Sequence, residues 1–236
     1  MTSAFPRDGW LRAAAVLVLV LLATSVVTTG IAASVYPGGT WMDRTTVGHS
    51  FWGNFLCDVA RTPALDGRPN PGAPWGHAAE WSLIVALFVF FWIAPALVDS
   101  PRRRRTIRIL GAVAALGLML VPVTVRVAHA VALIVGAGPG FAVAVLLIAG
   151  LRPRPLLALL GLAALGLSAL ELALYLVFRN RFSGAPLPPA VPAVQRLAVI
   201  AAIAWMGGCA AAILRGGRGQ EVVTAGTSST GSPRAT

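Results

Sequence analysis

Charged residues are scarce in this sequence. Only 11% of its 236 residues are charged, lysine is absent, and there are eight acidic side chains, two cysteines and three histidines. Apolar residues make up 57% of the chain, which is more than a soluble domain of this length can bury. Cys57 and Cys209 are too far apart in the chain to form a metal motif. No Walker loop or dinucleotide fingerprint is present, so nucleotide-dependent enzymes have no support.

The apolar residues gather in blocks long enough to cross a bilayer core, which takes about 20 residues of helix. We predict an all-α integral membrane domain over residues 1–215 and a small, polar, disordered cytoplasmic tail over 216–236. The first block exceeds the apolar part of a signal peptide, so we expect it to remain as a helix. The run 136–140, "GAGPG", is expected inside the fourth span as a kink or close-packing point. The six predicted spans cover residues 11–33, 80–98, 106–125, 128–150, 155–178 and 196–214.

The distribution of arginine predicts the orientation, since positive residues favour the cytoplasmic side of a membrane. The densest cluster, 102–105, falls between the second and third spans and places that loop and both termini inside. Twelve arginines and three acids then lie inside, and seven arginines and five acids outside, giving net charges of 12 − 3 = +9 and 7 − 5 = +2. We expect a multi-pass protein of the bacterial cytoplasmic membrane, with lipid headgroups and not nucleic acid facing its basic residues. The sequence leaves the oligomeric state open.

The longest polar stretch lies between the first two spans and contains "HSFWGNFLCDVARTPALDGRPN", residues 49–70. We predict a short amphipathic helix at the outer membrane surface, anchored by Trp52. The alternative is a local i,i+3 ion pair between Asp58 and Arg61 that only solubilises the loop. The prediction depends on four polar residues whose spacings of four, four and three place them on one helix face: Ser50, Asn54, Asp58 and Arg61.

Further polar residues fall at the same predicted depth. Glu171 lies within the fifth span, where a carboxylate is costly and usually faces the bundle with a partner. Arg126 and His129 lie between the third and fourth spans, and Gln195 and Arg196 open the sixth. We therefore predict an outward-facing polar cavity in which these residues join those of the loop. For Glu171, a buried structural ion pair and a functional role both stay open.

The segments "YPGG", "HSFWGNFLCDVART" and "GRPN" resemble an uncharacterised bacterial multi-pass membrane protein family, of the domain-of-unknown-function type and distantly similar to the DRAM/Sfk-like membrane families. A Pro-then-His element between the third and fourth helices and a Gln-Arg pair opening a late helix extend the resemblance. It implies a shared fold and site location, with no established chemistry. The matching positions are Tyr36, Pro37, Gly38, Gly39, Ser50, Asn54, Phe55, Asp58, Arg61, Thr62, Pro122, His129, Gln195 and Arg196.

We expect a non-catalytic protein whose outer cavity binds a lipid or small amphiphile and uses no cofactor. One alternative is a membrane-embedded, metal-dependent hydrolase of lipid substrates, although the chain has no His-x-x-x-His pair. The ligands available to such a metal are His49, His77, His129 and Asp58. The second alternative is a small-solute or proton-coupled transporter in which Glu171 relays protons, although no inverted repeat is apparent.

Overall fold

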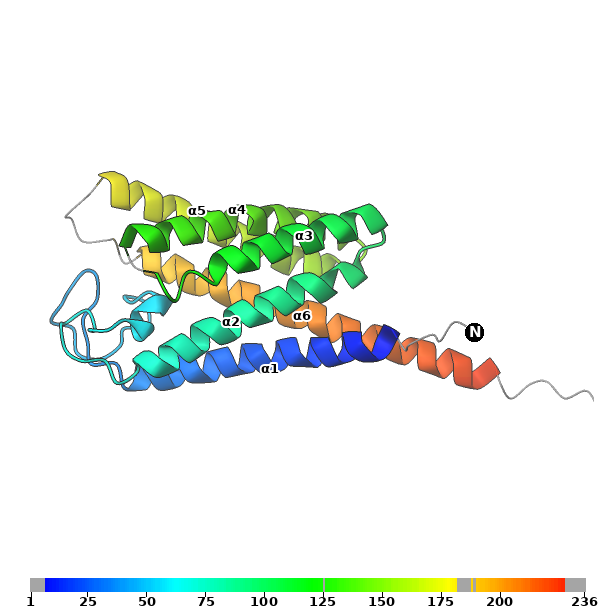
Figure 1. Ribbon diagram of the computed structural model, residues 1–236, viewed down its shortest axis with the longest axis horizontal. Helices are drawn as coiled ribbons and strands as arrows, with labels where there is room; N and C mark the ends of the chain where they lie inside the picture. Colours follow the sequence, from blue (N-terminus) through cyan, green and yellow to red (C-terminus); the bar gives the residue numbers. More distant parts are fainter. Residues whose placement is uncertain (1–6, 125, 182–187, 189, 228–236) are drawn as a thin grey trace, which may run out of the picture.

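Six long helices make up the described part of the computed structural model, and successive helices run in opposite directions (Figure 1). They are α1 (Arg7–Ser34), α2 (Ala73–Ile93), α3 (Pro101–Leu118), α4 (Arg126–Gly150), α5 (Pro155–Arg181) and α6 (Ala190–Thr227). Two short 3-10 helices, η1 (Leu56–Ala60) and η2 (Ala94–Leu97), stand before and directly after α2. The structure describes the backbone of residues 7–124, 126–181, 188 and 190–227, and within these all side chains except those of 7–8, 126–127, 129–130, 179–181 and 217–227.

Five helices in the described ranges are long and apolar enough to span a membrane, so the chain is a multi-pass, all-helical protein of the membrane type. The predicted all-α class is confirmed for these residues. The predicted third span falls on α3, which has 18 residues and begins with four arginines after Pro101. The five stretches are Gly9–Ser34, Ala73–Leu97, Val131–Gly150, Pro155–Phe178 and Ala190–Gly216.

Helix α3 begins and ends earlier than the sequence predicts. Ser100 caps it by accepting a hydrogen bond from the backbone N–H of Arg103, and Pro101 fits the first helical position, so the arginines lie within the helix. After Leu118 the chain turns through residues 119–124, because Pro122 disfavours a helical residue before it. The backbone N–H groups of this apolar turn bond to carbonyls three or four residues back. The turn therefore needs no outside partner for these donors.

Small residues let α2, α3 and α4 pack closely. A Cβ on Gly111 of α3 would lie 2.5 Å from the Cβ of Phe91 in α2, and one on Gly117 would lie 2.9 Å from the Cα of Gly136 in α4. Pro139 lies inside α4, so the glycine run falls within that helix, and Gly136 is a close-packing point, as the sequence predicts. Deeper in the core, the buried ring of Phe90 packs 5.4 Å from that of Trp205 in α6.

Residues 35–72, which we call the cap, fold over one end of the bundle, where α1 ends and α6 begins (Figure 1). The predicted amphipathic helix is wrong: within the cap only η1 is helical, and residues 51–54 form a turn and bend. The opposite end of the bundle carries the start of α1 and the α2–α3 connection (Figure 1).

Helix α6 continues to Thr227, whereas the sequence predicts a disordered tail from residue 216. Extending an existing helix requires no new nucleation, which is the costly step in helix formation. The last part of the predicted tail, 228–236, lies outside the described residues.

Candidate functional site

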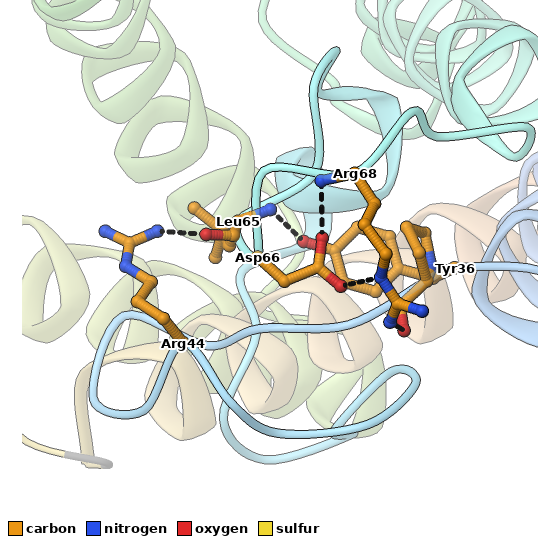
Figure 2. Close-up of polar contacts among 6 residues, drawn as sticks. Tyr36, Arg44, Leu65, Asp66 and Arg68 are labelled. Carbon is orange, nitrogen blue, oxygen red and sulfur yellow. Dashed lines mark hydrogen bonds and ion pairs between the residues drawn. The ribbon is translucent and has the colours of Figure 1, made fainter.

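The two ends of the cap are tied together next to α1 (Figure 2). The hydroxyl of the buried Tyr36 accepts a hydrogen bond from the backbone N–H of Leu65, at 3.0 Å, and Arg44 Nη1 donates to the carbonyl of Leu65, at 3.1 Å. Arg68 Nε pairs with Asp66 Oδ2 at 2.6 Å, and Nη2 of the same guanidinium donates to the backbone carbonyl of Pro37. These contacts fix the frame on which the interior of the cap is built.

Gly39, in the "YPGG" segment, is required by this frame. Its φ of 84° lies in the left-handed region, and a Cβ would lie 2.5 Å from the backbone nitrogen of Asp66. Its carbonyl also accepts a hydrogen bond from the side chain of Asn54, at 2.9 Å.

Asn54 is the centre of the cap, with 0% of its surface exposed. Its Oδ1 accepts from the backbone N–H of Ser50, at 2.9 Å, while its Nδ2 donates to the carbonyl of Gly39 and to Asp58 Oδ2, at 2.9 and 3.3 Å. Ser50 Oγ accepts from the N–H of Gly53, at 3.1 Å. The four-residue spacing of Ser50 and Asn54 thus comes from a turn in which each side chain accepts a hydrogen bond from a nearby backbone N–H. Such side-chain to backbone bonds compete with the backbone bonds of an α-helix.

Asp58 is 2% exposed and is surrounded by donors. Besides Asn54, its carboxylate accepts from Trp41 Nε1, at 3.0 Å, and from the backbone N–H of Phe55, at 2.8 Å. Burial raises the pKa of Asp58 above its ordinary value, and these hydrogen bonds oppose the rise. Burial and the nearby Asp58 also raise the pKa of the Cys57 thiol.

Arg196, in the first turns of α6, extends from the bundle into the cap with 4% of its surface exposed. Its Nη2 donates to His49 Nε2, at 2.9 Å, and to the backbone carbonyl of Asn54, at 3.2 Å. Its Nε is buried and has no hydrogen-bond partner among the residues that the structure describes. The exposed ring of Phe51 lies 5.1 Å from the guanidinium carbon.

His49 faces Arg196 as a neutral imidazole. Burial, together with the positive charge of Arg196, lowers the pKa of His49 from 6.5 to about 4. Because Nε2 receives the arginine N–H, the ring proton at neutral pH belongs on Nδ1. The partner of the buried arginine is therefore an uncharged side chain.

Gln195 connects the cap to a second helix. Its Oε1 accepts from the backbone N–H of Leu56, at 2.8 Å, and its side chain lies beside the carboxylate of Glu171 in α5. The ring of Phe55 meets that of Tyr175, also in α5, edge to face at 6.4 Å. The cap is thus docked on both α5 and α6.

The structure brings six of the nine polar residues predicted to converge to the junction of cap and bundle, in two groups. Hydrogen bonds join the first group, Ser50, Asn54, Asp58 and Arg196. The second group is Gln195, which bonds to the backbone of Leu56, and Glu171 beside it. Arg61 is exposed, with its guanidinium 5.5 Å from the ring of Trp41. No salt bridge within 4 Å joins it to the described side chain of Asp58, which is buried, so the two do not form the solvated local pair of the alternative; the charge of Arg61 still lowers the pKa of Asp58. The side chains of Arg126 and His129 lie outside the described residues. The outward-facing cavity stays a prediction.

Three residues of the cap, the buried Tyr36 and Asn70 and the partly exposed Trp41, were not predicted as part of the site. Tyr36 and Trp41 bond to the backbone and to Asp58 across gaps in the sequence that no helical or strand period reveals. Asn70 Nδ2 donates to the carbonyls of Val59 and Arg61, at 2.8 and 2.9 Å, and Asn70 Oδ1 accepts from the backbone N–H of Gly72, just before α2. The signal available for Asn70 was its place in "GRPN", between two prolines and just before a helix start.

No group of three or more histidine, cysteine, aspartate or glutamate side chains gathers among the residues that the structure describes. His77 pairs with Glu80 one turn along α2, at 3.3 Å, while His49 and Asp58 have the partners given above. The metal site of the hydrolase alternative is thus not assembled from His49, His77 and Asp58.

No family model matches the chain, and neither the curated proteins nor the solved structures contain a match. The family suggested by the short motifs therefore stays a prediction.

Proposed function

We propose that the chain is a six-pass protein of the bacterial cytoplasmic membrane, with both termini inside, and that its cap binds the anionic group of a lipid or small amphiphile without catalysis. The observation that carries the binding proposal is Arg196. Its charge is almost fully buried, its Nε has no partner, and it faces a neutral histidine. A buried charge is unfavourable unless an opposite charge pairs with it.

The charge of Asp58 acts on Arg196 from a distance, but among the described residues no hydrogen bond or salt bridge joins the two side chains. Its carboxylate is held by Trp41, Phe55 and Asn54, and the backbone carbonyl of Asn54 stands against the guanidinium of Arg196. A carboxylate or phosphate oxygen from a ligand would meet Nε, a buried donor with no partner among the described residues. It would enter past Phe51, whose half-exposed ring covers the guanidinium. The neighbouring Trp52, also exposed, is suited to the membrane interface.

The six-pass orientation is supported by charge and by tryptophan. The arginine-rich start of α3 lies at the end opposite the cap, which agrees with cytoplasmic placement (Figure 1). Exposed Trp75 and Trp92 lie 17 positions apart near the two ends of α2, about 26 Å at the helical rise. That separation is close to the roughly 30 Å of a bilayer core, whose boundaries tryptophan favours.

Lipid analysis of the purified protein tests the binding proposal. Native mass spectrometry in a mild non-ionic detergent should find one anionic amphiphile that is retained by the wild type and lost from Arg196→Gln. Arg61→Gln is the matched control, because it removes the same charge from an exposed arginine of the cap. Equal retention by both variants would contradict the proposal. Stoichiometric zinc in the wild-type preparation would overturn it in favour of the hydrolase.

Cysteine labelling tests the orientation. Val47 is 87% exposed in the cap, and Asp99 is exposed in the α2–α3 connection. In a chain lacking Cys57 and Cys209, a membrane-impermeant maleimide should label Val47→Cys in intact cells and Asp99→Cys only after the cells are opened. The reverse pattern, or labelling of both positions in intact cells, would refute the orientation.

A further inference from the structure

At the end of the bundle away from the cap, a groove of about 730 Å³ runs along α3 beside the end of α2. Its lining comes from α3 apart from one tryptophan of α2. Positions spaced by three and four along α3 share one face, which makes the groove a continuous strip down that helix. The lining residues are Trp92, Pro101, Arg104, Arg105, Arg108, Ile109, Ala112, Val113 and Leu116.

The groove is basic at one end and apolar along the rest. Three arginines occupy the first two turns of α3, and no acidic residue is among the described residues that line the groove. Further along α3, the exposed side chains of Ile109, Val113 and Leu116 follow one another down the same face. A ligand that fits this order has an anionic group at one end and a hydrocarbon chain at the other.

Two of the arginines are held in place by backbone carbonyls, one at the end of α2 and one directly after η2. Arg108 Nε donates to the carbonyl of Trp92, at 3.3 Å, and its guanidinium carbon lies 5.6 Å from the Trp92 ring. Arg104 Nε donates to the carbonyl of Val98. Both anchors use Nε, which leaves the terminal nitrogens of each fork to bind phosphate oxygens.

We propose that this groove binds one anionic phospholipid, with its phosphate at Arg104, Arg105 and Arg108 and an acyl chain along Ile109, Val113 and Leu116. Trp92 lies at the level of the lipid glycerol, where tryptophan is favoured. A zwitterionic headgroup is disfavoured, because its cationic part would enter a site with three positive charges and no carboxylate. This site is separate from the anion site at Arg196 and does not depend on it.

The experiment compares two double variants that remove the same charge from the same cluster. Arg105→Gln/Arg108→Gln changes the groove, whereas Arg102→Gln/Arg103→Gln changes neighbouring arginines that do not line it. Binding of phosphatidylglycerol and of phosphatidylcholine to the purified chain is measured by native mass spectrometry. We expect the groove pair to weaken phosphatidylglycerol binding about 30-fold and the control pair less than threefold, with phosphatidylcholine weak throughout.

Two further variants make the result specific. Arg105→Gln alone leaves the Trp92 and Val98 anchors intact, so a loss of binding in this variant cannot come from misfolding of the connection. Ala112→Phe fills the apolar part of the groove and should also weaken binding, while soluble glycerol phosphate should not displace the lipid. Both measurements are repeated in Arg196→Gln, where this lipid should remain bound. Equal losses from the groove and control pairs, equal binding of the two lipids, or unchanged binding in Ala112→Phe would each overturn the proposal.

Discussion

Replacing Asn54 by alanine should open the cap while leaving the helices in place. The substitution removes a fully buried side chain whose amide satisfies three groups: the N–H of Ser50, the carbonyl of Gly39 and one oxygen of Asp58. Asp58 keeps its bonds to Trp41 and Phe55, so the main loss falls on the two backbone groups. At about 1–3 kcal/mol for each buried group left unsatisfied, we expect the cap to lose about 3 kcal/mol of stability.

The thiol of Cys57, next to Asp58, measures this loss directly. Cys57 is partly exposed, but its raised pKa leaves little thiolate in the closed cap, so modification there is slow and opening of the cap accelerates it. A loss of about 3 kcal/mol corresponds to labelling about 100-fold faster by a thiol reagent in detergent, in a Cys209→Ala background.

Ser34→Ala is the control, since it removes an exposed hydroxyl that bonds only within its own helix. It should leave the Cys57 labelling rate within a factor of two of the wild type. If Asn54→Ala labels no faster than this control, Asn54 is not the centre of the cap, and the account of Ser50, Gly39 and Asp58 given above is wrong.

Two further predictions concern pH and packing. The pKa of His49 is about 4 in the folded cap and 6.5 in the unfolded chain, so protonation of His49 favours the unfolded chain. The stability that neutral His49 contributes is therefore present above pH 6.5 and is lost as the pH falls toward 4. The loss is about 2 kcal/mol after allowance for solvent screening. The melting temperature of the wild type should fall more steeply with decreasing pH than that of His49→Gln. The raised pKa of Asp58 acts in the opposite direction in both proteins. Parallel plots of melting temperature against pH for the two proteins would exclude a role for His49. Gly76→Ala should destabilise the protein by about 1–3 kcal/mol, since the new Cβ would lie 2.6 Å from the backbone of Ala60. Gly30→Ala, with nothing within 4 Å, should instead raise the melting temperature, and the same sign for both would contradict the close contact of η1 with α2.

The helices could be predicted because apolar blocks of membrane length leave little choice of structure, and Pro139 inside α4 agrees with that reading. The start of α3 could not be placed by hydropathy, since Ser100 and Pro101 begin the helix ahead of the arginines. In the cap, the helical spacing of Ser50, Asn54 and Asp58 misled the prediction, because these side chains bond to the backbone of a turn.

The contacts between the cap and the bundle had no local signal. Arg196 meets His49 across 147 positions, and Gln195 meets Leu56 across 139. The predicted depth of each residue in the membrane indicated which residues lie at the same level. That prediction placed Glu171 and Gln195 at the correct end of the bundle, the end that carries the cap. It could not say which of them touch, because that depends on the path of a cap whose own structure was predicted wrongly.

The short α3 has a consequence for the surrounding bilayer. From Ile109 to Leu118 it offers ten uncharged helical residues, about 15 Å, whereas the uncharged part of α1 after Arg12 covers the 22 residues 13–34, about 33 Å. In the six-pass arrangement, one side of the protein is therefore much shorter than a hydrocarbon core of about 30 Å, while the other matches it. Lipid beside α3 would have to thin while lipid beside α1 would not, so hydrophobic mismatch would differ around the circumference of a single chain. Such a chain is expected to partition into thin membrane regions, or to associate through its α3 side so that the short surfaces cover one another.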